Sequence, residues 1–179
     1  MPEEATITRA QTESKAGKYL TFALADEEYG LEILKVREII GIMDIAEVPR
    51  TPDFVKGVIN LRGKVIPVID LRLKFQMETI EQTEETCIIV VDVDGVEMGI
   101  IVDKVSEVLD IAAEEIEEPP SFGANVNTDF ILGMGKAQER VTILLDIGKV
   151  LSSMEVAELQ AATQEDSETE NNHQNEKQD

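Results

Sequence analysis

Residues 54–70 read FVKGVINLRGKVIPVID, and this stretch decides the fold class. Two mainly apolar runs, residues 58–61 and 65–69, flank a short polar segment that contains Gly63. Apolar runs of this length, rich in Val and Ile and separated by a glycine-containing turn, are typical of a β-hairpin. Residues 86–102 repeat the pattern, with a turn at Asp94 and Gly95. The sequence therefore predicts a mainly β fold.

Further strands and a few short helices are predicted around these hairpins. Apolar residues indicate strands near residues 20–24, 29–33, 130–133 and 141–145. The i, i+3, i+4 spacing of Val36, Ile39 and Ile40 predicts one or two helical turns instead. Asp70 precedes residues 71–75 as a helix N-cap would, and Asp146 has the same setting in the second half of the chain.

The chain contains an internal duplication. A shift of 69 residues, which becomes 76 further along, places similar residues on each other. The matched pairs are Gly30 with Gly99, Val36 with Val105, Glu38 with Glu107, Phe54 with Phe130, Gly57 with Gly133 and Asp70 with Asp146. Each copy has about 60–70 residues and about five short strands, which suits a small closed barrel without free sheet edges.

Differences between the two copies indicate functional positions. The clearest is NLRG at residues 60–63, which becomes KAQE at residues 136–139. Arg62 offers a planar guanidinium for pairing with a carboxylate, and Gln138 at the matched position does not. We expect Arg62 to pair with Glu38. The glycines kept in both copies are expected to meet backbone needs, such as a positive φ, a bulge or a close approach.

Composition excludes several classes of function. The 179 residues carry 37 acidic and 16 basic side chains and a net charge of -21, which argues against binding to nucleic acid or to anionic lipid. One cysteine and one histidine give no disulfide framework, zinc-ligand spacing or histidine-assisted nucleophile. We therefore expect a protein that is not an enzyme and uses no cofactor and no metal. A small carboxylate-dependent enzyme stays open as an alternative, because so many acids always offer pairs.

The organisation of the chain follows from the distribution of apolar residues. No apolar run approaches the length of a membrane span and the first residues have no signal core, so the expected location is cytoplasmic. We predict a disordered N-terminus at residues 1–17 and a disordered acidic tail at 164–179. Between them we expect a first β-barrel at 18–81, a second at 82–151 and a C-terminal helix at 152–163. Residues 18–81 hold 11 acids and nine bases, whereas residues 82–163 hold 17 acids and four bases.

Several motifs resemble the CheW family of chemotaxis coupling proteins. They are YGLEI at 29–33, VREI at 36–39, PDFVKGVINLRG at 52–63 and VIPVIDLR at 65–72. The resemblance covers about residues 18–155 and implies two SH3-like five-stranded β-barrels. It also implies a non-catalytic adaptor between chemoreceptors and a CheA-type histidine kinase. An adaptor of the same fold in another two-component or motility cascade is the alternative.

The resemblance implies two protein partners, without nucleic acid and without insertion into a membrane. The helical hairpin tip of a receptor would lie in an apolar groove between the barrels, and the kinase would dock through a regulatory domain that is similar to this chain. Residues 42–48 carry few charges, which favours them as an apolar kinase-docking patch. Expected receptor-binding residues are Val36, Glu38, Ile39, Arg62, Gly99 and Val105; expected kinase-binding residues are Ile42, Ile45, Val48 and Gly57.

Overall fold

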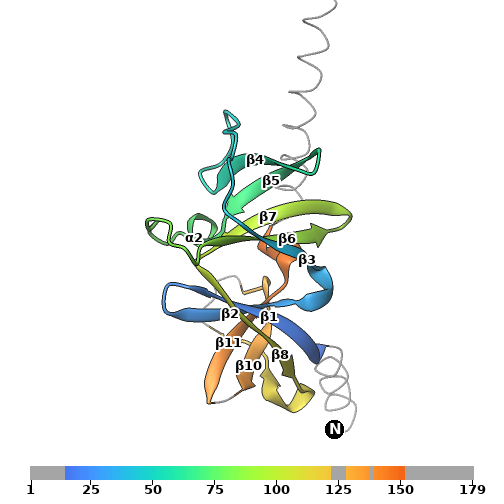
Figure 1. The fold of residues 1–179 in the computed structure, drawn as a ribbon. Helices are drawn as coiled ribbons and strands as arrows, with labels where there is room; N and C mark the ends of the chain where they lie inside the picture. The colour runs from blue at the N-terminus through green and yellow to red at the C-terminus, as the bar shows by residue number, and fades with distance from the viewer. Residues whose placement is uncertain (1–14, 122–127, 138, 152–179) are drawn as a thin grey trace, which may run out of the picture.

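The computed structural model describes residues 15–121, 128–137 and 139–151, and these ranges form a mainly β structure, as the sequence predicts (Figure 1). The strands are β1 (Gly17–Leu24), β2 (Glu27–Glu32), β3 (Val36–Gly41), β4 (Val55–Leu61), β5 (Lys64–Asp70), β6 (Cys87–Val93), β7 (Val96–Val102), β8 (Lys104–Ile111), β9 (Ile116–Glu117), β10 (Ile131–Ala137) and β11 (Arg140–Leu145). The helical segments are η1 (Ile33–Lys35), α2 (Leu71–Lys74), η2 (Ala113–Glu115) and α3 (Ile147–Val150).

The strands form two sheets, which lie one above the other in Figure 1. The five-stranded sheet has the order β3-β6-β7-β5-β4, and the six-stranded sheet has the order β8-β1-β2-β11-β10-β9. We call residues 36–102 the inner unit and residues 17–32 with 104–151 the outer unit. The predicted division into barrels at 18–81 and 82–151 is therefore wrong, because each sheet contains strands from both copies.

The duplication itself is present in the strand order. Each strand of the five-stranded sheet has a sequence counterpart in the six-stranded sheet. Replacing each strand in the order β3-β6-β7-β5-β4 by its counterpart gives β8-β1-β2-β11-β10, which is the order of the six-stranded sheet up to β9. The β1–β2 hairpin of the first copy lies in the outer unit, and the β6–β7 hairpin of the second copy lies in the inner unit. Equivalent hairpins can exchange places with the same contacts, as in domain swapping, so the repeat alone does not reveal the exchange.

Both units close through the segment that follows the matched strands β3 and β8. In the inner unit Ala46 bridges to Val58 on β4, and in the outer unit β9 pairs with β10. Gly57 has a φ of +139°, and a Cβ atom there would lie 1.9 Å from the Ala46 carbonyl oxygen. A Cβ atom on Gly133 would lie 3.0 Å from the Glu117 carbonyl oxygen. The matched glycines thus allow the same close backbone approach in each unit, as predicted.

The two units share one apolar core. Leu20, Leu31 and Leu145 from the outer unit pack in one cluster with Ile69 and Ile89 from the inner unit. A row of aromatic rings crosses between the units. Its centroid distances are 5.8 Å from Phe22 to Tyr29, 5.8 Å from Tyr29 to Phe75 and 5.6 Å from Phe75 to Phe130, and only Phe75 belongs to the inner unit. Each unit is small, so this shared burial contributes to the stability of both.

The short helices follow the sequence prediction at the two aspartates. Asp70 accepts hydrogen bonds from the amides of Arg72 and Leu73, and Asp146 caps α3 in the same way. The predicted helical turn at Val36, Ile39 and Ile40 is wrong. These residues form strand β3, which pairs with β6, because β-branched side chains suit a strand and pairing with β6 outweighs local periodicity.

The ends of the chain are only partly described. Strand β1 already begins at Gly17, the last residue of the predicted disordered N-terminus. The rest of that segment up to residue 14, the predicted helix at 152–163 and the predicted acidic tail at 164–179 lie outside the described residues.

Candidate protein-interaction site

The tip of the β4–β5 hairpin presents Arg62 in a fixed geometry. Arg62 and Gly63 have φ values of +53° and +85°, which is the pattern of a tight two-residue hairpin loop. The Asn60 side-chain oxygen accepts a hydrogen bond of 2.8 Å from the Gly63 amide and stabilises the turn. The motif that differs between the copies thus builds an exposed turn with a defined shape.

The predicted pairing of Arg62 with Glu38 is confirmed. Arg62 donates from its terminal Nη2 to Oε1 of Glu38 on β3. The Arg62 side chain is 72% exposed and the Glu38 side chain 29% exposed, so the pair lies at the surface. Ion pairs in such settings typically contribute about 0–1 kcal/mol. The contact therefore matters more for the position of the hairpin tip than for stability.

A second surface ion pair lies next to Glu38. Arg37, which precedes it on β3, donates from Nη2 to Oδ2 of Asp92 on β6 at 2.8 Å. This hydrogen bond, with a second one from the Gly95 amide, lowers the pKa of the Asp92 carboxyl below its ordinary value. Neighbouring residues on β3 thus bind two different elements of the inner unit.

The predicted receptor-binding residues divide into exposed and interior positions. Ile39 is 45% exposed on β3. Val36 and Val105 are half-buried and pack against the shared core, and Gly99 is buried in β7 beside Ile88. The structure brings Glu38, Ile39 and Arg62 to the surface of the inner unit, but it does not bring Gly99 there.

The predicted kinase-binding residues are half-buried or buried. Ile42 and Ile45 are half-buried and pack against the inner unit's own apolar cluster. Val48 is half-buried, and Gly57 is buried under the Ala46 carbonyl. An isolated bridge from Ala46 to Val58 holds segment 42–48 on β4. Met43, which is not among the predicted kinase-binding residues, is 36% exposed in this segment.

Exposed apolar residues occupy matched places in the two units. Ile39 on β3 and its counterpart Val108 on β8 are 45% and 49% exposed. Val65 on β5 and its counterpart Val141 on β11 are 52% and 55% exposed. Single exposed apolar residues are common, but two matched pairs indicate a duplicated surface. Both pairs can be predicted from the sequence, because the offsets of 69 and 76 residues place Ile39 on Val108 and Val65 on Val141.

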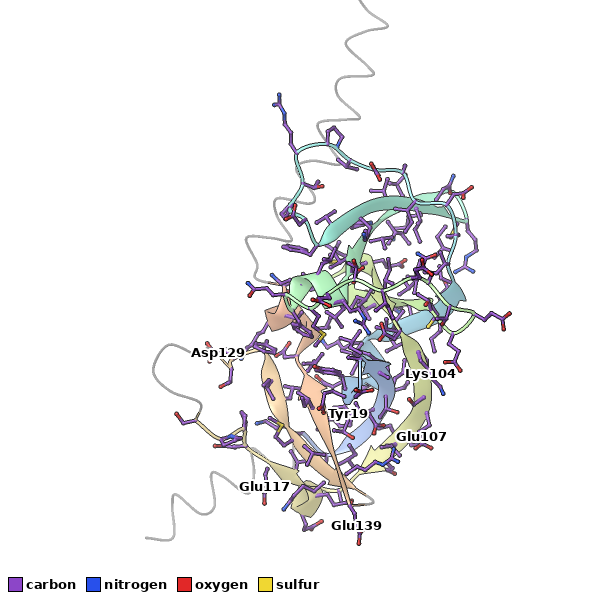
Figure 2. All side chains as sticks on the ribbon, turned by 90° about the vertical axis from the view of Figure 1, so that its left-hand side faces the viewer. Tyr19, Lys104, Glu107, Glu117, Asp129 and Glu139 are labelled. Carbon is purple, nitrogen blue, oxygen red and sulfur yellow. The ribbon has the colours of Figure 1, made fainter. Side chains whose placement is uncertain are left out.

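The charge contrast between the units is smaller than the contrast between the sequence halves. The inner unit has 12 acidic and seven basic residues, a net of -5, and the outer unit has 13 acidic and five basic residues, a net of -8. Glu107, Glu117 and Glu139 lie on the outside of the outer unit in Figure 2, and Glu117 is paired with Lys136. The exchange of hairpins redistributes the acids of the second copy over both units.

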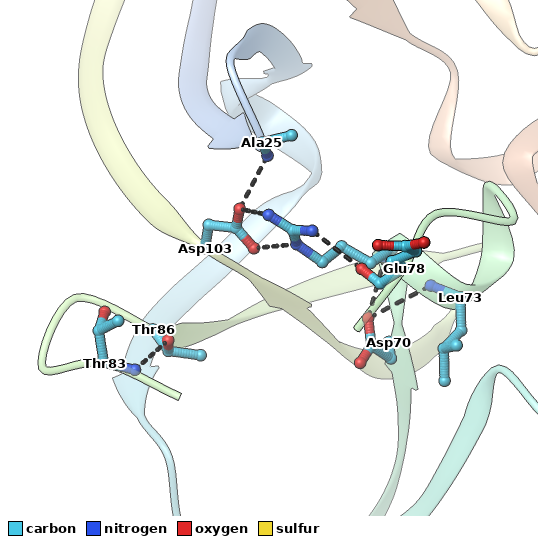
Figure 3. Close-up of polar contacts among 8 residues, drawn as sticks. Ala25, Asp70, Leu73, Glu78, Thr83, Thr86 and Asp103 are labelled. Atoms are coloured by element: carbon cyan, nitrogen blue, oxygen red, sulfur yellow. Dashed lines mark hydrogen bonds and ion pairs between the residues drawn. The ribbon is translucent and has the colours of Figure 1, made fainter. Parts of the chain in front are cut away.

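One polar pocket lies beside α2 in the described part of the chain. Its volume is about 180 Å³, and its lining includes Lys56, Asp70, Arg72 and Asp103. The polar contacts at this place are drawn in Figure 3. Within residues 15–121, 128–137 and 139–151, no three His, Cys, Asp or Glu side chains gather as a metal ion requires. Among the same residues, no helix has the length and hydropathy needed to cross a bilayer.

Comparison with known proteins agrees with the fold and the motifs. A family model described as CheW-like domain matches residues 18–155. The chemotaxis protein CheW of Klebsiella aerogenes is 44% identical over 153 residues, which cover 86% of this chain and 92% of the relative. The CheW of Treponema pallidum is 32% identical over 144 residues, 78% and 85% of the two chains.

A solved structure is also similar. The crystal structure of the scaffolding protein TtCheW from Thermoanaerobacter tengcongensis matches with a TM-score of 0.70 and 37% identity, and the match covers 76% of this chain and 93% of that one. The family model spans most of the chain, and the relatives align over most of their own lengths. The chain therefore belongs to the CheW-like family.

Proposed function

We propose that this chain is a non-catalytic cytoplasmic adaptor that couples chemoreceptors to a CheA-type histidine kinase. The family and the scaffolding relative support the broader role, that of a chemotaxis adaptor. The observation that carries the specific proposal is the Arg62–Glu38 pair, which holds a copy-specific hairpin tip against β3. An adaptor needs such a rigid presented surface rather than a reactive centre.

The receptor surface is proposed on the inner unit around Glu38, Ile39 and Arg62. A helical hairpin presents apolar side chains at i, i+3 and i+4 together with charged neighbours. Strand β3 offers the exposed Ile39 on one face and Glu38, paired with Arg62, on the other, because neighbouring residues of a strand point to opposite faces. Val36 and Val105 support β3 and β8 from the core, and Gly99 keeps β7 close to Ile88. These three residues are proposed to act through the strands they position.

The kinase surface is proposed on segment 42–48. Its exposed contact would be Met43, while Ile42 and Ile45 hold the segment on the inner unit's apolar cluster. Val48 lies at the end of the segment, and Gly57 allows Ala46 to pair with β4. A regulatory domain with the same fold would meet this segment through its own exposed apolar side chains.

Binding of the full chain to both purified partners tests the proposal. Isothermal titration against a receptor hairpin fragment and, separately, against the kinase regulatory domain should show both complexes. Ile39→Glu should weaken receptor binding selectively, and Met43→Glu should weaken kinase binding selectively. Val141→Glu is the control, because Val141 is 55% exposed on β11 in the outer unit, whereas both proposed surfaces lie on the inner unit. Failure of the unmodified chain to bind either partner would overturn the proposal.

A further inference from the structure

Asp103 lies where the chain passes from the inner unit to the outer unit, between β7 and β8. Its backbone amide donates to the Ala23 carbonyl at 3.2 Å, and its Oδ2 accepts from the Ala25 amide at 2.8 Å (Figure 3). The first bond reaches the end of β1, and the second reaches the turn between β1 and β2, where Ala25 has a φ of +54°. One residue of the crossing segment thus fixes the turn of an outer-unit hairpin.

Arg72 approaches the same carboxylate from α2 in the inner unit. Its Nε donates to Oδ1 of Asp103 at 2.7 Å, and its Nη2 donates to Oδ2 at 2.5 Å. Its Nη1 donates to the Glu78 carbonyl at 2.9 Å. The Arg72 and Asp103 side chains are only 12% and 19% exposed. A continuous set of bonds therefore joins the inner unit to the β1–β2 turn of the outer unit.

The same contact is missing at the matched place in the repeat. The counterpart of Asp103 is Leu34, which is 92% exposed, and the counterpart of Arg72 is Gly148. The chain crosses between units at both places, since β2 leads into β3 as β7 leads into β8. Two similar units thus form with the ion pair at only one crossing, so the barrel fold itself does not require it.

The carboxylate is held in its charged form. Burial acts to raise the pKa of Asp103, but the hydrogen bonds from Arg72 and the Ala25 amide outweigh it, so the pKa lies below its ordinary value. The same hydrogen bond acts to raise the pKa of Arg72. Both charges persist around neutral pH.

We propose that Arg72 and Asp103 are positioning residues that fix the relative orientation of the two units. The shared core attracts the units to each other, but apolar burial is non-directional. A two-bond contact between a planar guanidinium and a carboxylate has a defined geometry and selects one orientation. Both proposed partner surfaces lie on the inner unit, so this orientation role stands apart from the proposed adaptor function.

Distances between spin labels on the two units test the orientation directly. In a full-length Cys87→Ser background, Lys64→Cys and Arg140→Cys place labels at matched exposed positions on β5 and β11, for measurement by pulsed electron paramagnetic resonance. We expect one narrow distance distribution, which Asp103→Asn and Arg72→Gln shift or broaden. Arg72→Lys, which keeps the charge and loses the planar fork, should give an intermediate width.

Arg37→Gln is the matched control, because it removes an ion pair that lies within the inner unit. It should leave the distance distribution unchanged. The proposal is overturned if Arg72→Gln or Arg72→Lys, folded by circular dichroism, keeps the unmodified distribution. It is also overturned if Arg37→Gln broadens the distribution equally.

Partner binding gives a separate readout. Because both proposed surfaces lie on the inner unit, Arg72→Gln should bind the receptor fragment and the kinase domain nearly as the unmodified chain does. Loss of either complex in this variant would contradict the separation of the orientation role from the binding surfaces. If the unmodified chain binds neither partner, the adaptor proposal fails, and the distances still decide the role of the ion pair.

Discussion

The Arg62 guanidinium at the tip of the β4–β5 hairpin donates a hydrogen bond to the Glu38 carboxylate on β3, although 24 positions separate the two residues in sequence. Asn60 shapes the turn that presents the arginine. In the second copy, Glu107 matches Glu38 but Gln138 replaces the arginine. The contact is therefore a feature of the inner unit that the repeat does not explain.

Arg62→Ala should keep the fold and weaken binding to receptor or kinase. Loss of an exposed ion pair changes the free energy of unfolding by about 0–1 kcal/mol. Urea unfolding and titration against each partner measure the two effects. Arg37→Ala removes an arginine from the adjacent pair and is the control. Unmodified affinity for both partners in Arg62→Ala would remove this residue from the site.

Glu38→Ala should weaken binding to the same partner as Arg62→Ala. If the two side chains act as a pair, the double variant should lose little more affinity than either single variant, because interacting residues are not additive. The four proteins of this cycle are compared by titration. Additive losses in the double variant would contradict the pairing while leaving each residue in the site.

The hairpins were predictable because their signals are local. Residues 58–69 and 86–102 combine β-branched runs with turn residues. The Asp70 cap is also local, because its side chain accepts hydrogen bonds from the amides two and three residues further along the chain. The exchange of the β1–β2 and β6–β7 hairpins was not predictable, because both copies offer equivalent partners. Segment 36–40 has the spacing of a helix but forms a strand, because its pairing with β6 is a long-range contact that local spacing does not encode.

The site was predictable in part. The Arg62–Glu38 pair followed from comparing the two copies, but the burial of Gly99 and Gly57 depends on packing that spacing does not reveal. Val65 and Val141 were missed, although they occupy matched outward positions. The contact between Arg72 and Asp103 joins residues that have no charged counterparts in the other copy.

Gly57→Ala should strongly destabilise the protein. The new methyl group would lie 1.9 Å from the Ala46 carbonyl oxygen, and the φ of +139° is unfavourable for alanine. Because backbone must move, the expected loss is about 2–3 kcal/mol or more, at the upper end for overpacking. Gly41→Ala is the control, since a Cβ atom there meets no atom within 4 Å. Equal thermal stability of both variants would contradict the closure described for the inner unit.

Two buried threonines should respond differently to replacement by valine. Thr21 Oγ1 donates to the Glu107 carbonyl at 2.8 Å and accepts from its amide at 3.1 Å. Thr21→Val should cost about 0.5–1.5 kcal/mol through the lost hydrogen bonds. Among the described residues, Thr142 Oγ1 is buried without a hydrogen-bond partner, so Thr142→Val should be neutral or stabilising. Urea unfolding of both variants compares them; a larger loss in Thr142→Val would contradict the assignment.

Acid should destabilise the unmodified chain more steeply than Asp103→Asn. The pKa of Asp103 is lower in the folded protein than in the unfolded chain, where it is about 3.9. A lowered folded pKa stabilises the folded state above the unfolded value, and this contribution is lost as the pH falls through the folded value. The free energy of unfolding from urea titrations between about pH 3 and pH 7 should therefore fall less toward acid in Asp103→Asn than in the unmodified chain. Parallel acid dependence in the two proteins would show that the carboxylate of Asp103 gains nothing from Arg72 and Ala25 on folding.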